Sequence, residues 1–440
     1  MKNIILISTF LIFLSTSVSA STAPNIQEIR LSLDSVWVVV GGILVFFMQA
    51  GFALIESGSV RSKNTVNVLM KNYMDTCIGG IIFWLFGFGL MFGLNQTGWI
   101  GLSHFMPDQL DDWHWNLLFF QMMFAATATT IASGAMAERI HFVAYVMSAI
   151  FVSGVIYPIF GSWAWGGLFG GDGWLKALGF IDFAGSTVVH SIGGWVALAG
   201  IIVLGPRLGR FGRKGQSHFL AGHNLPLVAL GGFILWFAWF GFNAASTVAA
   251  SVSIGRIALN THLAACAAAS TYMILALLQS KAVLMRHTIN ASLAGLVAIT
   301  AGCATMSPPF AIITGAIAGL LITFVPQFIE KMQLDDVVDA VTVHGVCGAW
   351  GTLAAGIFFE KALFNLDIIL VQALGVGAAL IWGFGASFIM FKLLDKLLGG
   401  LRVSQQHEQR GLDYTEHAEL SYPEFQRDVT FETENITHRH

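Results

Sequence analysis

Two histidines occupy matching positions in two apolar stretches of the 440-residue chain. His190 lies in DFAGSTVVHSIGGW, residues 182–195, and His344 lies in DAVTVHGVCGAW, residues 339–350. Both stretches contain the pattern V-H-x-[IV]-x-G and have a carboxylate one or two helical turns before the histidine. A histidine deep in apolar surroundings is costly unless its ring nitrogens are satisfied, so each of the two is a functional-site hypothesis. We therefore expect the two segments to meet, with the imidazoles facing each other along a path through the protein.

Several interpretations of the residues around this pair remain open. Asp182 is a candidate helix cap that accepts backbone N–H bonds, and also a candidate for holding a cation electrostatically from behind a site. A zinc site would need three or four ligands, and only Cys347 could join the two histidines. We therefore predict no metal ion and no cofactor. A buried pair of satisfied imidazoles is the structural alternative to a functional pair.

Aromatic and hydroxyl side chains share two further helix faces. By their spacing, one face carries Phe120, Gln121 and Phe124, and the other carries Trp239, Phe242 and Ser246. Trp165 lies in the glycine-rich stretch WAWGGLFGG. Ring faces attract a partly desolvated cation by about 1–2 kcal/mol, and a hydroxyl accepts an N–H bond. Without a carboxylate, these faces suit a weakly hydrated cation with N–H bonds better than a metal ion, and two phenylalanines below could exclude water. Ordinary core packing is the alternative.

The composition predicts a polytopic membrane protein. Only 11% of the residues are charged, 55% are hydrophobic and the mean hydropathy is +0.72, whereas about 25% of residues are charged in soluble domains. The 48 glycines suit helices that approach closely in a membrane. The four cysteines have no CxxC spacing and are interpreted as apolar core residues. The net charge of −3 says little, because the charges lie in loops and the tail.

The first twenty residues are typical of a signal peptide. Lys2 precedes a mostly apolar run over residues 4–14, and small residues end at Ala20. An uncleaved first helix is the alternative. Cleavage would put the mature N-terminus outside and imply a bacterial inner membrane.

Hydropathy and loop charge predict the topology. A hydrocarbon core of about 30 Å needs about 20 apolar residues per helix. Eleven such spans are centred near Gly41, Phe83, Ala126, Phe151, Ala197, Leu235, Ala268, Gly295, Gly319, Gly348 and Ala379. The even-numbered connections carry only Lys176, Arg256 and Lys361, and the other loop lysines and arginines lie in the odd-numbered ones. Because basic residues accumulate on the cytoplasmic side, we predict the N-terminus outside and the C-terminus inside.

The histidine segments are the fifth and tenth of these all-α spans. Equivalent helices five spans apart cross in opposite directions, which predicts an inverted five-helix repeat, spans 1–5 and 6–10, with span 11 outside it. Transporters of this kind place their substrate path between the halves near the midplane. The basic segment 207–223 links the halves, or serves only to orient the chain. We expect the membrane domain to end near residue 400 and residues 401–440 to form a cytoplasmic tail, mostly extended or disordered.

Long motifs in a fixed order resemble the ammonium transporter family (Amt/MEP/Rh), on its bacterial Amt branch. The resemblance covers residues from about 34 to about 419. Its landmarks are FFMQAGFALIESGSVRSKN at 46–64, GAMAERIHF at 134–142, DFAGSTVVHSIGG at 182–194, HNLP…WFAWFGFNAAS at 223–246, DAVTVHGVCGAWG at 339–351 and GLDYTEHAE at 411–419.

This resemblance implies an eleven-helix bundle with a pore through each subunit of a homotrimer. It implies an outer ammonium recruitment site at Phe124, Trp165 and Ser246, a gate of Phe124 and Phe242 flanked by Phe120 and Trp239, pore histidines at His190 and His344, and Asp182 as a supporting acid. In bacterial relatives a PII signalling protein blocks the cytoplasmic face. Ser186 departs from the glycine common at its position. Trp165 is preferred to Trp163 for its Trp-Gly-Gly context, and the tail continues well past the family's last motif.

The function expected from these features is membrane transport of ammonium and ammonia. The chain would recruit ammonium, deprotonate it and conduct ammonia past the histidines. An Rh-type channel is disfavoured by Trp165 and Ser246. An ammonium sensor that signals through its tail is the alternative from another class, although about 40 polar residues are too few for an output domain. No nucleophile–base pair or cofactor motif points to an enzyme.

Overall fold

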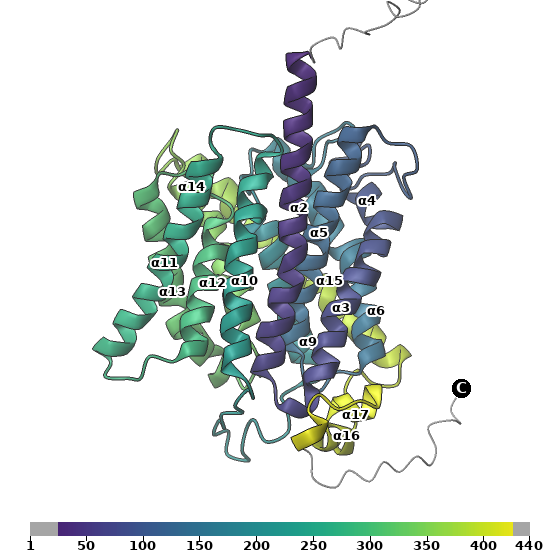
Figure 1. Ribbon diagram of the computed structural model, residues 1–440, viewed down its shortest axis with the longest axis vertical. Helices are drawn as coiled ribbons and strands as arrows, with labels where there is room; N and C mark the ends of the chain where they lie inside the picture. The colour runs from purple at the N-terminus through teal and green to yellow at the C-terminus, as the bar shows by residue number, and fades with distance from the viewer. Residues whose placement is uncertain (1–24, 426–440) are drawn as a thin grey trace, which may run out of the picture.

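The computed structural model describes residues 25–425, and within them the chain folds into one bundle of helices (Figure 1). No β-sheet forms in this part of the chain beyond two isolated bridges, at Ile140–Arg402 and Phe211–Ser217. The predicted signal peptide, residues 1–20, lies outside the described residues. We call the end of the bundle where α2 begins the N-terminal face, and the end that carries α16 and α17 the C-terminal face.

The main helices follow the predicted spans in order. They are α2 (Ile26–Ser59), α3 (Thr65–Ile82), α4 (Phe88–Phe92), α5 (Asp112–Ala135), α6 (Phe142–Phe151), α7 (Tyr157–Trp165), α9 (Ile192–Leu204), α10 (Leu225–Ala244), α11 (Ile254–Leu278), α12 (Met285–Ile299), α13 (Pro308–Lys331), α14 (Cys347–Ile357) and α15 (Leu366–Leu397). Four π-helical turns continue some of them: η2 (Phe83–Gly87) joins α3 to α4, η3 (Val152–Ile156) joins α6 to α7, η4 (Ser186–Ser191) precedes α9 and η6 (Val341–Val346) precedes α14.

Nine helical stretches within residues 25–425 are long and apolar enough to cross a membrane. Helices also stand at the two other predicted positions, but they are shorter: α12 has 15 residues, and the second is Val341–Ile357. The predicted all-helical membrane architecture is therefore confirmed. The count of eleven spans stays a prediction.

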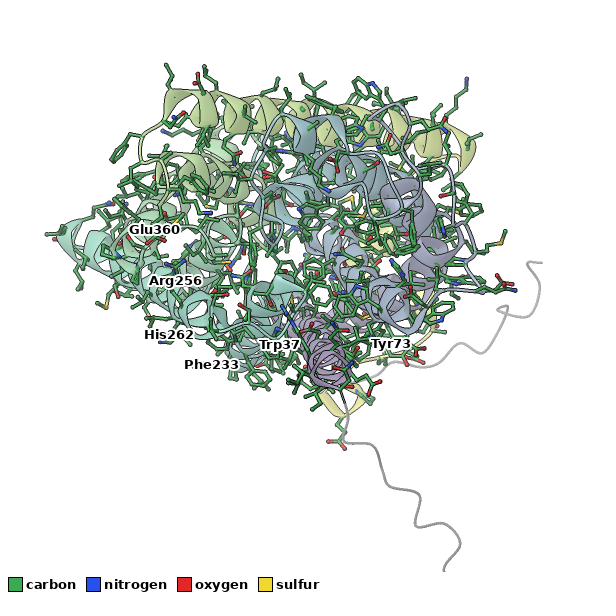
Figure 2. The ribbon with its side chains drawn as sticks, turned by 90° about the horizontal axis from the view of Figure 1, so that it is seen from above. Trp37, Tyr73, Phe233, Arg256, His262 and Glu360 are labelled. Atoms are coloured by element: carbon green, nitrogen blue, oxygen red, sulfur yellow. The ribbon has the colours of Figure 1, made fainter. Side chains whose placement is uncertain are left out.

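Apolar side chains cover the outside of the bundle, as a hydrocarbon solvent requires. Phe233 and Ile381 expose 69% and 77% of their surface, and Figure 2 shows Phe233 at the outer edge of the bundle. Inside, small residues allow close packing of α2 against α10: a Cβ at Gly51 would lie 2.7 Å from Leu235 Cγ, and one at Gly231 would lie 2.6 Å from the Gly51 carbonyl oxygen.

The C-terminal segment is ordered and docked as far as it is described. α16 (Gln405–Arg410) and α17 (Leu412–His417) lie at the C-terminal face, where α17 packs against α3. The Leu412 N–H donates to Asn64 Oδ1 at 2.9 Å, and Asp413 Oδ1 accepts from the Asn67 N–H at 2.9 Å. The prediction of a mostly extended tail is therefore wrong for residues 401–425. Specific polar contacts hold this segment, and a hydropathy pattern does not reveal them.

The basic linker also has a structural role beyond orientation. The Arg207 guanidinium donates to Asp335 Oδ2 at 2.8 Å and to Glu138 Oε1 at 2.9 Å, and all three side chains are buried. Burial alone would raise the pKa of the Asp335 carboxyl, but hydrogen bonds and positive charge from Arg207, with Arg139, hold it well below its usual range. This network ties the linker to the connection between α5 and α6, which carries Glu138, and to the connection between α13 and η6, which carries Asp335.

Replacing Asp335 by asparagine should destabilise the protein strongly. Breaking a buried ion pair by removing one partner costs about 3–5 kcal/mol, so we expect the melting temperature in detergent at pH 7 to fall by roughly 5 °C or more. Because the folded pKa is depressed, the contribution is fully present above the unfolded pKa of about 3.9 and is lost as the pH falls below it. The wild type should therefore lose its advantage over the variant on acidification, and an advantage that persists unchanged would contradict the ion-pair account.

Candidate functional site

The two histidine segments have the same local geometry. Asp182 precedes His190 by eight residues, and Asp336 precedes His344 by eight. Five residues before each histidine the backbone is left-handed, with φ of 110° at Gly185 and 61° at Asp339. Each histidine then sits in a π-helical turn, η4 or η6. π-Helical turns are rare and occur frequently at functional sites.

A carboxylate begins each of these turns, and it is buried at Asp182 and partly buried at Asp336. Asp182 Oδ2 accepts the backbone N–H groups of Thr187 at 2.9 Å and Val188 at 2.8 Å, and its Oδ1 accepts that of Gly185 at 3.0 Å. Asp182 therefore does cap the turn that carries His190. In the second copy, Asp336 Oδ2 accepts the Val341 N–H at 2.8 Å.

The structure corrects the start of the second copy. The comparison of the two histidine segments within the sequence placed the start of the second copy at Asp339. The Asp339 carboxylate was therefore treated as the counterpart of Asp182. Asp339 instead accepts a hydrogen bond from Asn290 Nδ2 at 2.9 Å. The counterpart is Asp336, and the equal spacing of eight residues was the available signal.

The two imidazoles meet in the centre of the bundle. His190 Nδ1 and His344 Nδ1 are 3.2 Å apart, and both rings are buried. At this distance one nitrogen must donate and the other accept, so the pair shares one proton and charging both rings at once is opposed. Glycine permits the approach of their backbones, since a Cβ at Gly194 would lie 2.2 Å from the Gly345 nitrogen. His190 Nε2 has no hydrogen-bond partner within residues 25–425.

Two of the predicted gate residues, Phe242 and Trp239, pack directly against His190. The rings of Phe124 and Phe242 are parallel, with centroids 4.1 Å apart and an interplanar angle of 19°. The Phe242 centroid lies 5.3 Å from that of His190, and Trp239 stacks on His190 at 5.0 Å. Phe120 packs beside Phe124 at 4.7 Å. The predicted aromatic set and the histidines therefore form one continuous group.

A cavity of about 450 Å³ lies beyond this phenyl stack, and its lining includes Phe120, Gln121, Phe124, Trp165 and Ser246. Ser246 Oγ donates to the Phe242 carbonyl oxygen at 2.8 Å, which leaves its lone pairs able to accept. Trp165 Nε1 donates to the Asp182 carbonyl oxygen at 2.7 Å, which fixes the indole. Trp163 lies outside this lining and packs among Trp99, Trp174 and Trp382.

Two charged residues near this cavity differ in their position. Asp182 is not among the lining residues, which is compatible with the expected place of its carboxylate behind the site. Lys176 does line the cavity, and its charge is balanced by Asp172 at 2.9 Å. Lys176 had been considered only as a loop charge. A lysine four residues after an aspartate is a common helix-surface pair, so the sequence carried no signal of its position.

A second, smaller cavity lies on the other side of the histidine pair. Its volume is about 20 Å³, and its lining includes Phe52, Glu56, Asn290 and His344. Glu56 lies near the end of α2 and Asn290 near the start of α12, so this cavity lies between the histidines and the C-terminal face. Glu56 was not singled out in the sequence, although a lone carboxylate inside an apolar span was a signal that could have found it.

Comparison with known proteins relates this arrangement to one family. A model of the Ammonium Transporter Family matches residues 36–422. The ammonium transporter Amt2 of Archaeoglobus fulgidus is 42% identical over 96% of each chain, and a putative ammonium transporter of Synechocystis sp. is 44% identical over 88% of this chain and 73% of its own.

Solved structures show the same fold. A structure of a sensor Amt protein superposes with a TM-score of 0.86 at 42% identity, over 89% of this chain and 100% of that one. Mep2 of Candida albicans superposes with a TM-score of 0.78 at 26% identity, over 85% and 87%. The matched region contains every helix from α3 to α17 and both histidine segments. The matched family is one of transporters and not of enzymes, which confirms the prediction that this protein is not an enzyme, and the chain belongs to the ammonium transporter family.

Proposed function

We propose that the protein transports ammonium across a bacterial inner membrane by recruiting NH4+ in the 450 Å³ cavity, deprotonating it and conducting NH3 past the histidine pair. The observation that carries the proposal is the unbroken series of cavity, stacked phenyl rings and hydrogen-bonded imidazoles. An ion at the centre of a membrane costs several kcal/mol. Neutral ammonia avoids most of this cost and can exchange hydrogen bonds with the imidazole nitrogens.

The cavity has the chemistry to select ammonium. Trp165 and Phe124 offer ring faces, and Ser246 offers a hydroxyl acceptor. Each contact is worth about 1 kcal/mol. Asp182 would add negative potential from behind the indole that it holds through its carbonyl oxygen. A hydrated metal ion would lose more solvation than these groups return.

The same proposal includes the topology and the assembly. The 450 Å³ cavity would face outward and α16 and α17 the cytoplasm, with eleven spans built as an inverted repeat. The packing of α2 on α10 and of η4 on η6 supports the repeat, because these are equivalent elements of the two halves. We further propose a cleaved signal peptide, a homotrimer and a PII-type protein as the partner at the cytoplasmic face.

Solid-supported membrane recordings on liposomes with the purified protein test this function. Ammonium pulses should evoke currents if transport is electrogenic. If transport is electroneutral, the liposomes should take up labelled methylammonium, and ammonium should compete with this uptake. Ser246→Leu or Trp165→Leu should weaken the apparent affinity several-fold, because one contact of about 1 kcal/mol is lost. Ser251→Leu, which changes a serine outside the cavity lining, should leave the affinity unchanged. Identical competition curves for all four proteins would contradict the cavity as the recruitment site.

A sensor of the same fold is the second candidate, because one similar solved structure is of a sensor Amt protein and because the C-terminal segment docks on the bundle. A sensor would bind ammonium without catalysing flux above that of protein-free liposomes. Binding without flux in the recordings above would favour it.

A further inference from the structure

A buried cluster of charged side chains lies beside the cavity of about 20 Å³ that His344 lines, which we call the inner cavity. Glu56 of α2, Lys71 and Asp75 of α3 and Tyr145 of α6 are all essentially inaccessible to solvent. Glu56 Oε2 accepts from Asn72 Nδ2 at 3.0 Å and from Ser133 Oγ at 2.9 Å. Lys71 Nζ donates to the Ser133 carbonyl oxygen at 2.8 Å, and the Tyr145 hydroxyl donates to Asp75 Oδ2 at 2.6 Å. Lys71 Nζ also lies 4.9 Å from the centroid of the Tyr145 ring, so these side chains form one cluster.

The charges of this cluster do not balance. Glu56 and Asp75 are two carboxylates, whereas Lys71 is the one cation among these side chains. Arg139 is also buried, but its guanidinium donates to the carbonyl oxygens of Ala135, Ala137, Gly205 and Asp335. An uncompensated charge at this depth is costly. The cluster therefore favours the uptake of one proton or one cation.

One oxygen of Glu56 is free to accept this proton or cation. Glu56 Oε1 has no hydrogen-bond partner within residues 25–425, and Glu56 lines the same cavity as His344. The cavity volume of about 20 Å³ exceeds the roughly 10–15 Å³ that one water needs. One water or one ammonia molecule, which is of similar size, therefore fits between the imidazole and the carboxyl group.

The carboxyl group is held in place from behind. A Cβ at Gly134 would lie 3.0 Å from Glu56 Cδ and 2.6 Å from Val338 Cγ2. Glycine thus lets α5 press against the Glu56 side chain, while Asn72 and Ser133 hold the other oxygen. The free oxygen has little room to turn away from its position.

We propose that Glu56 is the proton-exchanging residue on the inner side of the histidine pair. This inference rests on the proposed function, with the proton crossing separately from ammonia. The proton that ammonium loses first moves to the imidazole pair. A water in the inner cavity then transfers the proton to Glu56, so that an N–H bond of the charged pair breaks and the O–H bond of Glu56 forms. Ammonia then enters the cavity, the O–H bond breaks and an N–H bond forms, which returns Glu56 as carboxylate and releases NH4+. One positive charge crosses for each ammonium.

Glu56→Gln tests this role, because glutamine keeps the size and one acceptor but carries no exchangeable acid proton. In liposomes, an ammonium pulse on the wild type should evoke a current with little internal alkalinisation beyond that of protein-free liposomes, since ammonia and proton enter together. The current of the Glu56→Gln variant should be at least about tenfold smaller than that of the wild type. Its rate of internal alkalinisation should rise above that of protein-free liposomes, because ammonia still passes. Glu56→Asp should restore part of the current.

Glu138→Gln is the matched control. Glu138 is an equally buried carboxylate, but it pairs with Arg61 and Arg207 and lines neither cavity. Its current per folded protein should equal that of the wild type. A Glu56→Gln variant with an unchanged current would overturn the proposal. So would a correctly folded Glu56→Gln variant that loses current and ammonia flux together. A wild type with neither signal above protein-free liposomes would instead overturn the proposed function itself.

Discussion

Replacing His190 and His344 together by alanine should abolish selective ammonium transport while the protein still reaches the membrane. The Nδ1 atoms of the pair are 3.2 Å apart. The adjacent Phe242 ring has no polar group, and the Trp239 N–H already donates to Thr300 Oγ1 at 2.9 Å, so neither ring can replace the proton-sharing bond. Without the imidazoles, ammonia loses its acceptors and the proton loses its route. Flux of labelled methylammonium and ammonium-evoked current should both fall to the level of protein-free liposomes, a change of at least about a hundredfold.

Single carboxylate substitutions separate a pore role from a structural one. His190→Asp or His344→Glu adds a fixed negative charge without enlarging the side chain, so part of the desolvation cost of an ion is offset. These variants should admit potassium or another cation. A purely structural pair predicts less protein in the membrane but unchanged selectivity. Normal abundance together with intact selectivity in the carboxylate variants and the double alanine would exclude the pore role.

Asp182→Ala should have the second-largest effect, on stability and on transport together. The carboxylate accepts three backbone N–H groups, those of Gly185, Thr187 and Val188, and alanine would leave all three unpaired in a buried site. Each unpaired group costs about 1–3 kcal/mol. The turn η4 carries His190, so its distortion should move the imidazole away from His344. We expect a loss of thermal stability of several kcal/mol and at least about a tenfold loss of transport.

Asp336→Ala and Asp182→Asn provide the comparison. Asp336 accepts the Val341 N–H in the equivalent turn, a single backbone bond in place of three, so its loss should cost less. Asparagine at position 182 keeps one acceptor oxygen and should retain part of the stability. Equal and small losses for all three variants, measured by thermal unfolding in detergent and by methylammonium uptake, would show that the cap does not position His190.

Local properties of the sequence were sufficient to predict where the helices lie and which residues stand at the centre. A hydrocarbon core imposes about 20 apolar residues on each helix, so the helix positions follow from composition along the chain. Helices stand at every predicted centre, including the short α12. The repeated V-H-x-[IV]-x-G pattern predicted that His190 and His344 would meet, and periodicity placed Phe242 and Ser246 on one face. Each of these inferences needs only the composition, spacing and repetition of residues along the chain.

The tertiary structure decided what depends on residues far apart in the chain. The C-terminal segment was found docked because Asn64 and Asn67, about 350 residues earlier, bind it. Glu56 gained its significance from Ser133, which lies 77 residues away, and from the cavity it shares with His344. Such polar contacts have no period and change hydropathy little. They form only when the helices have packed, and for this reason the sequence alone could not predict them.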